Sequence, residues 1–402
     1  MIQGRDIVVI GIQPWDITIG SNCKNIALEF AKHNRVLYIN PPLDRASLYR
    51  QKNSEATIKR VKIWKSGKSE LIEIDNNLWN LYPATLLESI NWIGFNPLFD
   101  WLNFLNNKKF AKQITQACQI LNFENIIIFN DSDMFRSYYL KDLLNPSVYV
   151  YYTRDNLISV SYWRRRGVRM EAKHMKKADL VVANSTYLAD LAKKHNPNSF
   201  YVGQGCDVSL FDDKLVTRIP GDILNIPKPI IGYIGALFSL RLDIKVLQHV
   251  AEQKPDWSIV LVGPEDEEFE ASNLHQLSNI YFLGNKSTNE LPEYLNQFDV
   301  AINPQILNEV TIGNYPRKID EYLAMGKPVV ATRTLAMSVF EEHSYLAGSK
   351  EEFVSCIESA LQNDNKEVHI ARENFAREHT WENNVIQIFK AIEAVKPNLF
   401  KK

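Results

Sequence analysis

Short apolar runs alternate with longer amphipathic stretches along almost the whole chain. The runs suit buried β-strands, and the stretches between them have the spacing of helices that bury one face. Strands that alternate with helices are typical of βαβ units and a parallel sheet. The predicted strands are residues 6–11, 36–39, 125–130, 148–152 and 179–183 in the first half, and 230–234, 258–262, 280–283, 300–303 and 328–332 in the second.

The alternation stops over residues 203–229 and then restarts. This stretch contains Gly205, Pro220, Gly221 and Pro227, which interrupt helices and strands. We therefore interpret it as an interdomain linker. The prediction is an α/β protein with two doubly wound, Rossmann-like domains, residues 1–207 and residues 208–380.

Composition narrows the class of protein. The 402 residues are 45% hydrophobic and 23% charged, with a net charge of −1, which fits a two-domain globular protein and gives no electrostatic reason for nucleic-acid binding. The four cysteines lie far apart and the histidines show no metal-binding spacing, so we expect neither disulfides nor a metal site. No apolar run approaches the roughly 18 residues that span a bilayer. We expect a cytoplasmic protein.

Residues 308–332 contain the most informative motif. Pro316 suits the first turn of a helix over residues 317–325, and Gly326 suits the position after its end. Such a helix begins at the ligand-binding edge of the sheet, where free N–H groups and Lys318 favour a phosphate. Glu321 shares a face with Lys318 and has the chemistry to accept ribose hydroxyls. A surface ion pair between capping residues is the alternative.

A second motif follows the first strand of the second half. Residues 232–237, GYIGAL, lack the GxGxxG pattern of dehydrogenases and the P-loop pattern. Gly235 allows a ligand to approach the backbone, and Arg241 is placed to bind a phosphate with two parallel hydrogen bonds. A plain strand–helix turn with an exposed arginine is the alternative.

These segments together resemble a known family. IIGYIGAL followed by Arg241, then LVGP, YFLGNKSTNELPEYLNQFDVAINP and YPRKIDEYLAMGKPVVAT are similar to the donor domain of GT-B glycosyltransferases of the family 4 type, near bacterial teichuronic-acid glycosyltransferases. The tail HTWEN resembles the family's closing helix. The resemblance implies two domains facing a cleft, with a C-terminal helix over residues 381–402 that crosses back to the first domain.

The resemblance also implies roles for individual residues. Arg241 and Lys318 would bind the diphosphate of a nucleotide sugar and Glu321 its ribose, while Gly284 would line the base pocket. The family often carries a glutamate at the position of Gly313, and here Asn314 or Glu309 stands nearby instead. The retaining or inverting outcome is therefore left open.

The first domain offers candidates for the acceptor side. Gly20, in the loop after the first strand, would permit a backbone turn toward the sugar phosphate. Asp155 follows another strand and matches an acidic position of the family, so it is the candidate catalytic base, with Arg154 beside it. An ordinary loop and a surface salt bridge are the respective alternatives.

The predicted function is a hexosyltransferase-like enzyme that moves a sugar from a UDP- or GDP-sugar to an acceptor hydroxyl in cell-surface polysaccharide or glycolipid synthesis, with no cofactor besides the donor. A nucleotide-sugar 2-epimerase or a non-catalytic partner subunit of the same fold are the alternatives. Basic residues 59–68 and apolar residues 86–105 are interpreted either as a peripheral contact with the inner face of a membrane, receiving a lipid-linked acceptor, or as an insertion with a solvated basic face.

Overall fold

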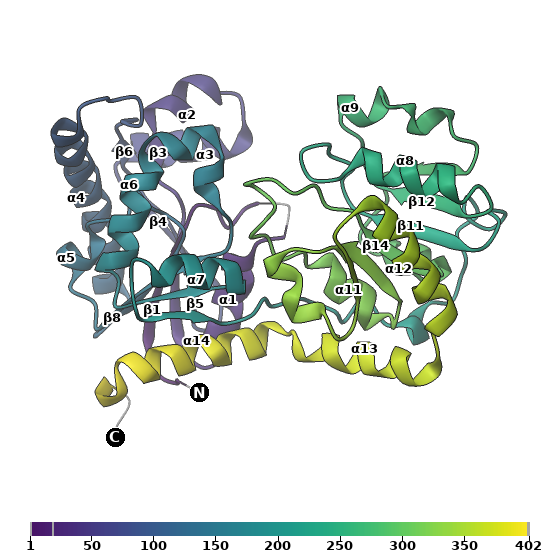
Figure 1. Cartoon of the computed structure of the whole chain (residues 1–402). Helices are drawn as coiled ribbons and strands as arrows, with labels where there is room; N and C mark the ends of the chain where they lie inside the picture. Colours follow the sequence, from purple (N-terminus) through teal and green to yellow (C-terminus); the bar gives the residue numbers. More distant parts are fainter. Residues whose placement is uncertain (1, 18–19, 400–402) are drawn as a thin grey trace. The chain divides into compact units, whose positions relative to one another are not determined.

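The computed structural model describes residues 2–17 and 20–399. The chain divides into two compact units, which are drawn in Figure 1. The N-terminal unit comprises residues 1–203 and 381–402, and the C-terminal unit comprises residues 204–380. Each unit is a mainly parallel sheet with helices on both faces, so the α/β class and the two Rossmann-like units follow the sequence prediction.

The sheet of the N-terminal unit has the strand order β10-β9-β8-β7-β1-β2-β5-β4. All neighbouring strands are parallel except β4, which runs antiparallel to β5 at the edge. The strands are β1 (Asp6–Gly11), β2 (Arg35–Ile39), β4 (Glu70–Asp75), β5 (Leu78–Tyr82), β7 (Ile127–Asp131), β8 (Val148–Thr153), β9 (Leu180–Ala183) and β10 (Ser199–Tyr201), while β3 (Leu43–Asp44) and β6 (Leu86–Leu87) form a separate small ladder.

Strand β1 shows how this unit builds two cores. Ile7 and Val9 point into one apolar cluster, while Val8 and Ile10 point into another, as expected for alternate residues of a strand buried on both faces. The first cluster includes α1 (Asn22–Ala31) and α14 (Trp381–Val395). The second includes residues of α4 (Asn96–Ile120), α5 (Leu140–Leu144), α6 (Ser161–Lys177) and α7 (Thr186–Lys193).

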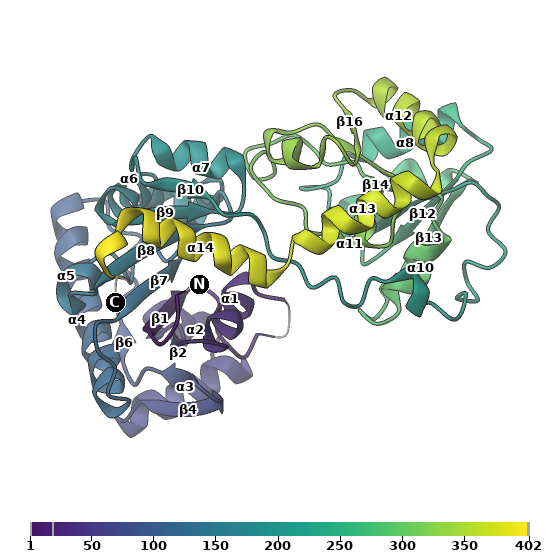
Figure 2. The same cartoon turned by 90° about the horizontal axis from the view of Figure 1, so that it is seen from below.

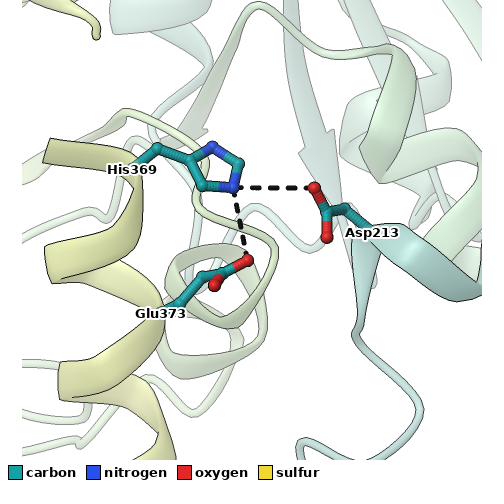
Figure 3. Close-up of side chains that lie close together, drawn as sticks. All are labelled: Asp213, His369 and Glu373. Atoms are coloured by element: carbon teal, nitrogen blue, oxygen red, sulfur yellow. Dashed lines mark hydrogen bonds and ion pairs between the residues drawn. The ribbon is translucent and has the colours of Figure 1, made fainter. Parts of the chain in front are cut away.

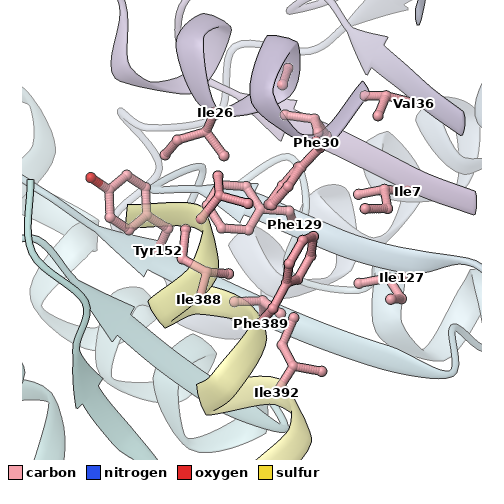
Figure 4. Packing of buried hydrophobic residues seen from close by; sticks show 14 of the residues in the cluster. Ile7, Ile26, Phe30, Val36, Ile127, Phe129, Tyr152, Ile388, Phe389 and Ile392 are labelled. Atoms are coloured by element: carbon pink, nitrogen blue, oxygen red, sulfur yellow. The ribbon is translucent and has the colours of Figure 1, made fainter. Parts of the chain in front are cut away.

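The closing helix α14 completes the core of the N-terminal unit (Figure 4). Phe389 stacks on Phe30 of α1 with ring centroids 5.2 Å apart. The Asn384 amide donates hydrogen bonds to the carbonyls of Val202, at 3.0 Å, and Gly203, at 2.7 Å. The last residues of the chain therefore hold together the unit with which the chain begins; residues 400–402 of the expected helical segment lie outside the described residues.

The C-terminal unit has a six-stranded, wholly parallel sheet with the order β13-β12-β11-β14-β15-β16. This is the Rossmann order, in which the chain starts in the middle, fills one side and then crosses to the other. The strands are β11 (Ile230–Ile234), β12 (Ser258–Val262), β13 (Ile280–Gly284), β14 (Val300–Asn303), β15 (Val329–Thr332) and β16 (Tyr345–Ala347).

Two groups of helices cover the faces of this sheet, as Figure 2 shows. Helices α8 (Ile244–Gln253) and α12 (Lys350–Asn363) pack on one face. Helices α10 (Leu291–Gln297), α11 (Lys318–Ala324) and α13 (Lys366–Glu378) pack on the other. The short α9 (Glu267–Glu270) lies between β12 and β13 in the chain.

The prediction of an interdomain linker over residues 203–229 is wrong. From Gln204 onward this stretch belongs to the C-terminal unit. It has little regular structure, but Phe211 and Ile223 are buried in the same apolar cluster as β11 and α11. Glycine and proline excluded helices and strands there, as expected, yet its apolar side chains still pack on the core.

Residues 44–110, where no strand was predicted, contain α2 (Arg45–Arg50), α3 (Glu55–Ser66), β4, β5 and most of α4. The basic residues 59–68 lie mainly on α3. Helix α4 has 25 residues, but it buries Asn103, Asn106 and Asn107. No helix within residues 2–17 and 20–399 combines the length and the apolarity needed to cross a membrane.

Truncation of Phe389 tests the role of α14. Phe389→Ala leaves a cavity against Phe30, so we expect the free energy of unfolding of the N-terminal unit to fall by about 3–5 kcal/mol. Phe95→Ala is the matched control, because the Phe95 side chain is exposed and its loss should change stability by less than about 0.5 kcal/mol. Urea denaturation followed by circular dichroism measures both. Equal stability of the two variants would contradict a structural role of α14.

Candidate functional site

A cavity of about 330 Å³ lies at the carboxyl edge of the C-terminal sheet. It is bordered by residues at the ends of β11 and β14, the two neighbouring strands between which the chain changes direction across the sheet. Open α/β sheets bind ligands at this topological switch point. The lining residues are Tyr233, Ile234, Gly235, Arg241, Leu242, Leu291, Asn303, Gln305, Thr311, Asn314, Tyr315, Pro316, Arg317, Lys318 and Glu321.

The turn after β11 requires glycine. Gly235 has φ +141°, a conformation that side chains disfavour, and a Cβ there would lie 2.6 Å from Nζ of Lys318. Gly263, at the corresponding end of β12, has φ +152°, and its Cβ would lie 2.0 Å from the carbonyl oxygen of Gly235. The two turns therefore pack backbone against backbone, which leaves room for Lys318 at the edge of the sheet.

Helix α11 is anchored directly to the end of β11. The Tyr322 hydroxyl accepts a hydrogen bond from the Ile234 N–H at 2.9 Å and donates one to the Ile234 carbonyl at 3.2 Å. Ile234 and Tyr322 are both buried, so the N–H and the carbonyl of Ile234 cannot bond to water there. The two bonds to Tyr322 satisfy these backbone groups instead. This tie fixes the start of α11, and with it Lys318 and Glu321, against the end of the strand.

The helix is shorter than the sequence predicted. It begins at Lys318, not at residue 317, and has only seven residues. Pro316 and Arg317 form a preceding turn in which the Ile319 N–H donates to the Pro316 carbonyl at 2.9 Å. Gly326 has φ +64° directly after the helix, as expected for a terminating glycine. A helix of two turns has a small dipole, so anion binding here depends chiefly on side chains.

Lys318 is held without a carboxylate directly bonded to its ammonium group. The ammonium donates a hydrogen bond to the Tyr233 hydroxyl and lies 3.8 Å from the centre of the Tyr233 ring. Burial lowers the pKa of Lys318 to about 7, with a contribution from the positive charge of Arg241, while Glu321 opposes the shift. An anion entering the cavity would reverse this shift by stabilising the charged form.

Glu321 lies one helical turn after Lys318 and shows the opposite shift. Burial raises the pKa of Glu321 to about 7, although Arg317 and Lys318 both favour its charged form. The carboxylate is thus a strong hydrogen-bond acceptor in a partly dry site. Two adjacent hydroxyl groups, such as those of a ribose, are suitable donors to it.

Two further cations line the cavity. The loop of Arg241 is fixed by its backbone, because its N–H donates to the Phe238 carbonyl at 2.8 Å and its carbonyl accepts from the Ile306 N–H at 2.9 Å. Within residues 2–17 and 20–399, the guanidinium groups of Arg241 and Arg317 have no hydrogen-bond or ion-pair partner. Together with Lys318 they make three positively charged side chains among the described lining residues, against one carboxylate, that of Glu321. This excess of positive charge favours an anion with more than one charge.

The structure brings together five of the predicted donor-site residues: Gly235, Arg241, Asn314, Lys318 and Glu321 all line the cavity. Gly284 ends β13, in the left-handed region, and does not line it. Gly20 and Asp155 belong to the N-terminal unit and are not among the residues that line this cavity.

Sequence reasoning missed several lining residues. Arg317 was expected in the first helical turn, where its charge favours a nearby diphosphate, but it was not named as a site residue. Tyr233 was counted only as part of a buried strand. The signal for Tyr233 was a hydroxyl at the penultimate position of a strand that ends at a ligand-binding edge. Gln305 was also missed; its amide donates to the Thr311 carbonyl at 2.9 Å and so holds the loop that leads to Asn314.

Asp155 follows β8 in the N-terminal unit and is partly exposed. The Arg154 guanidinium binds Asp155 at 3.1 Å and Asp131 at 2.9 Å. Asp131 is completely buried, and burial raises its pKa despite Arg154. Asp133, two residues on, forms its own ion pair with Arg136 at 2.7 Å. The Asp131 and Asp133 carboxylates are therefore bound by different arginines and do not form a joint metal-binding pair.

Residues 228–363 match the sequence profile of a family described as glycosyl transferases group 1. The matched residues all lie in the C-terminal unit. The chain is also 28% identical over 249 residues to TuaH of Bacillus subtilis, which is described as a teichuronic acid biosynthesis glycosyltransferase. That alignment spans 59% of this chain and 62% of TuaH, which is less than two thirds of that relative. The resemblance predicted for the group 1 domain is confirmed.

Solved structures show the same fold along the chain. Sucrose-phosphate synthase from Thermosynechococcus elongatus has a TM-score of 0.64 at 16% identity, covering 98% of this chain and 99% of its own. HepE from Anabaena, solved with UDP, has a TM-score of 0.63 at 15% identity, covering 98% and 100%. Likeness at this level establishes the fold, so the predicted GT-B fold of two Rossmann-like units is confirmed.

The partly buried side chain of Lys318 has a measurable consequence for stability. The folded-state pKa lies below the unfolded-state value, so the unfolded chain binds more protons between about pH 7 and pH 10, and the free energy of unfolding rises with pH across that window. Lys318→Met should stabilise the ligand-free protein by about 1 kcal/mol at pH 7, and this advantage should shrink toward pH 10. Thermal unfolding of both proteins across this range measures it. A variant that is less stable than wild type at pH 7 would show that Lys318 is not strained by burial.

Proposed function

We propose that this protein transfers a sugar from a nucleotide diphosphate sugar, a UDP- or GDP-sugar, to an acceptor hydroxyl. The observation that carries the proposal is the convergence of Arg241, Arg317 and Lys318 on a cavity at the switch point of a group 1 domain. A diphosphate is a compact dianion, and it matches this excess of positive charge. The relative HepE, solved with UDP, supports a uridine nucleotide.

The proposed chemistry stabilises the leaving group. As the bond between the sugar and the diphosphate breaks, negative charge accumulates on the phosphate oxygens. Tyr233 holds Lys318 beside the cavity before the reaction, so Lys318 would stabilise that charge without reorganising. Arg241 lines the same cavity and would add a second positive charge. The pKa of Lys318, lowered to about 7 by burial, would rise as the diphosphate enters, which makes its charged form the bound form.

The remaining contacts of the donor are proposed from position. Glu321 would accept hydrogen bonds from the ribose, and Gly235 would allow the phosphates to approach the backbone. Asn314 lines the cavity and would contact the sugar. Gly284, after β13, and Gly20, in the N-terminal unit, are proposed contacts of the base and the sugar phosphate. No cofactor besides the donor is part of the proposal.

On the acceptor side we propose Asp155 as the base that takes the proton of the acceptor hydroxyl. Arg154 orients it, since the guanidinium is fixed by the completely buried Asp131.

The acceptor is proposed to be a cell-surface polysaccharide or a glycolipid, as the similarity to TuaH supports. The N-terminal unit exposes Trp92, Phe95 and Trp101 next to the arginine-rich start of α6. Arg165 donates to the Trp92 carbonyl at 2.8 Å, so the exposed aromatic rings and the cations share one surface. Such a surface suits peripheral contact with an anionic membrane from the cytoplasmic side.

Loss of either cation should slow the transfer. Lys318→Ala and Arg241→Ala are each expected to reduce kcat/KM for glycosyl transfer by at least about tenfold, or about 1.4 kcal/mol of transition-state stabilisation. Arg218→Ala is the control, because Arg218 is an exposed arginine paired with Glu293 and outside the cavity lining. Mass spectrometry of the glycosylated acceptor measures the product.

Wild-type rates in both cavity variants would remove the cations from the mechanism. Turnover of the donor without any acceptor, giving an isomeric nucleotide sugar, would instead identify a 2-epimerase. Binding without any turnover would identify a non-catalytic subunit.

Substitution of Asp155 distinguishes an effect on nucleotide binding from an effect on catalysis. Asp155→Asn keeps the shape of the side chain but removes its capacity to accept a proton, so transfer should fall by about 100-fold or more while nucleotide affinity stays within about twofold. Isothermal titration with the nucleotide and the transfer assay measure the two quantities. Asp179→Asn is a matched control in the same unit, because Asp179 lies before β9 and pairs with Lys141. Transfer at the wild-type rate in Asp155→Asn would refute the role of base.

A further inference from the structure

A second group of polar side chains lies in the C-terminal unit outside the donor cavity. Asp213, His369 and Glu373 point toward one another, as Figure 3 shows. His369 and Glu373 are one helical turn apart on α13, whereas Asp213 begins the short 3-10 helix Asp213–Leu215 near the start of the unit. Their candidate ligand atoms all lie within 4.8 Å of one another.

The distances in this group are longer than those of short hydrogen bonds, although His369 and Glu373 form one long hydrogen bond, and they are also compatible with the spacing of metal ligands. Nε2 of His369 lies 3.6 Å from Oδ2 of Asp213 and 3.3 Å from Oε1 of Glu373. Hydrogen bonds between such atoms are typically about 2.7–3.2 Å. Two ligands of a tetrahedral ion at about 2.0–2.1 Å from the metal are themselves about 3.3–3.4 Å apart. The imidazole nitrogen and both carboxylates thus have room for an ion between them.

The surroundings leave one ligand atom without a partner. Oδ1 of Asp213 is shielded from solvent and has no hydrogen-bond partner among the described residues. The Glu373 side chain is only 8% exposed, and Arg377 lies 3.7 Å from its Oε2. Asp213 is 29% exposed. A buried carboxylate such as that of Glu373 is stabilised by a positive charge close to it. A divalent ion at Nε2 would supply that charge.

The imidazole is held in place by its packing. The ring of His369 lies against Gly326, where a Cβ would come within 2.3 Å of it, so this glycine admits the ring as well as ending α11. Helical residues four apart project on the same side, as the spacing of metal-binding residues on helices requires. The prediction that the histidines lack metal-binding spacing considered histidines alone and missed this histidine–glutamate pair.

We propose that Asp213, His369 and Glu373 form a site for one divalent transition-metal ion, Zn²⁺ in the first place. One imidazole and two carboxylates are suitable ligands for Zn²⁺, with water at the remaining position. The ion would join the irregular segment after residue 204 to α13, so its role is structural and independent of the proposed glycosyl transfer. Mg²⁺ prefers oxygen ligands and retains its waters, so it should not replace Zn²⁺ here.

Metal binding by the whole chain tests this proposal. After dialysis against EDTA and then against metal-free buffer, the wild-type protein should take up one Zn²⁺ per chain in equilibrium dialysis. Its thermal midpoint should rise by about 5 °C at saturating Zn²⁺, because the ion binds the folded state, and Mg²⁺ should have no such effect. Asp213→Ala and His369→Gln should abolish both the uptake and the rise.

His275→Gln is the matched control, because His275 also pairs with a carboxylate, Glu265 at 2.8 Å, but has no second carboxylate in that pair. That variant should respond to Zn²⁺ as the wild type does. Equal responses of the wild type and both site variants, or no response of the wild type, would overturn the proposal and leave a simple ion pair of His369.

Cobalt provides a readout that does not depend on a variant folding. Co²⁺ bound to the wild-type chain should give visible d–d bands without an intense thiolate charge-transfer band, since the ligands are nitrogen and oxygen. A thiolate band would place the ion on a cysteine and refute this site.

Discussion

The hydrogen bonds between the Tyr322 hydroxyl and the backbone of Ile234 are the constraint on which the candidate site depends. They join α11 to the last residue of β11, using the backbone N–H and the carbonyl of the buried Ile234. Because α11 has only two turns and no side-chain cap at its start, its own hydrogen bonds position it weakly. The tie to the strand therefore determines where Lys318 and Glu321 lie relative to Gly235.

Holding Lys318 and Glu321 at this position costs free energy in the ligand-free protein. Lys318 is brought into partly dry surroundings beside a tyrosine ring and near Arg241, and its pKa falls accordingly. Glu321 is shifted in the opposite direction by the same burial. A site built only for stability would pair these charges or replace them with apolar side chains. The arrangement becomes favourable when an anion and a hydrogen-bond donor occupy the cavity, which is what a nucleotide diphosphate provides.

Much of the fold was predictable, because buried strands of a parallel sheet are short apolar runs that glycine and proline delimit. The five predicted strands of the C-terminal unit match the observed ones to within one residue at their ends, while the short β16 was not predicted. The long helix α4 was not predicted, since asparagines on its buried side, such as Asn103 and Asn107, obscure the helical pattern. The linker was predicted wrongly because turn-forming residues say where regular structure stops, not whether the chain leaves the core.

The site was partly predictable for the same reason. Lys318, Glu321 and Arg241 stand at positions that the topology brings to one edge of the sheet, so their proximity follows from the strand order. The role of Tyr233 depends on a side chain reaching past the end of its strand, which the pattern of the strand does not reveal. The group of Asp213, His369 and Glu373 joins segments far apart in the chain, and no local spacing predicts such a contact.

The central claim is that the cavity binds a nucleotide diphosphate through its cations. Thermal unfolding of the wild-type protein and of Lys318→Ala, each with UDP, GDP, ADP and dTDP, tests this claim most directly, because a ligand that binds the folded state raises the midpoint. We expect UDP or GDP to raise the midpoint of the wild type and the same nucleotide to have little effect on the variant. No rise with any of the four nucleotides, or an equal rise in both proteins, would contradict it.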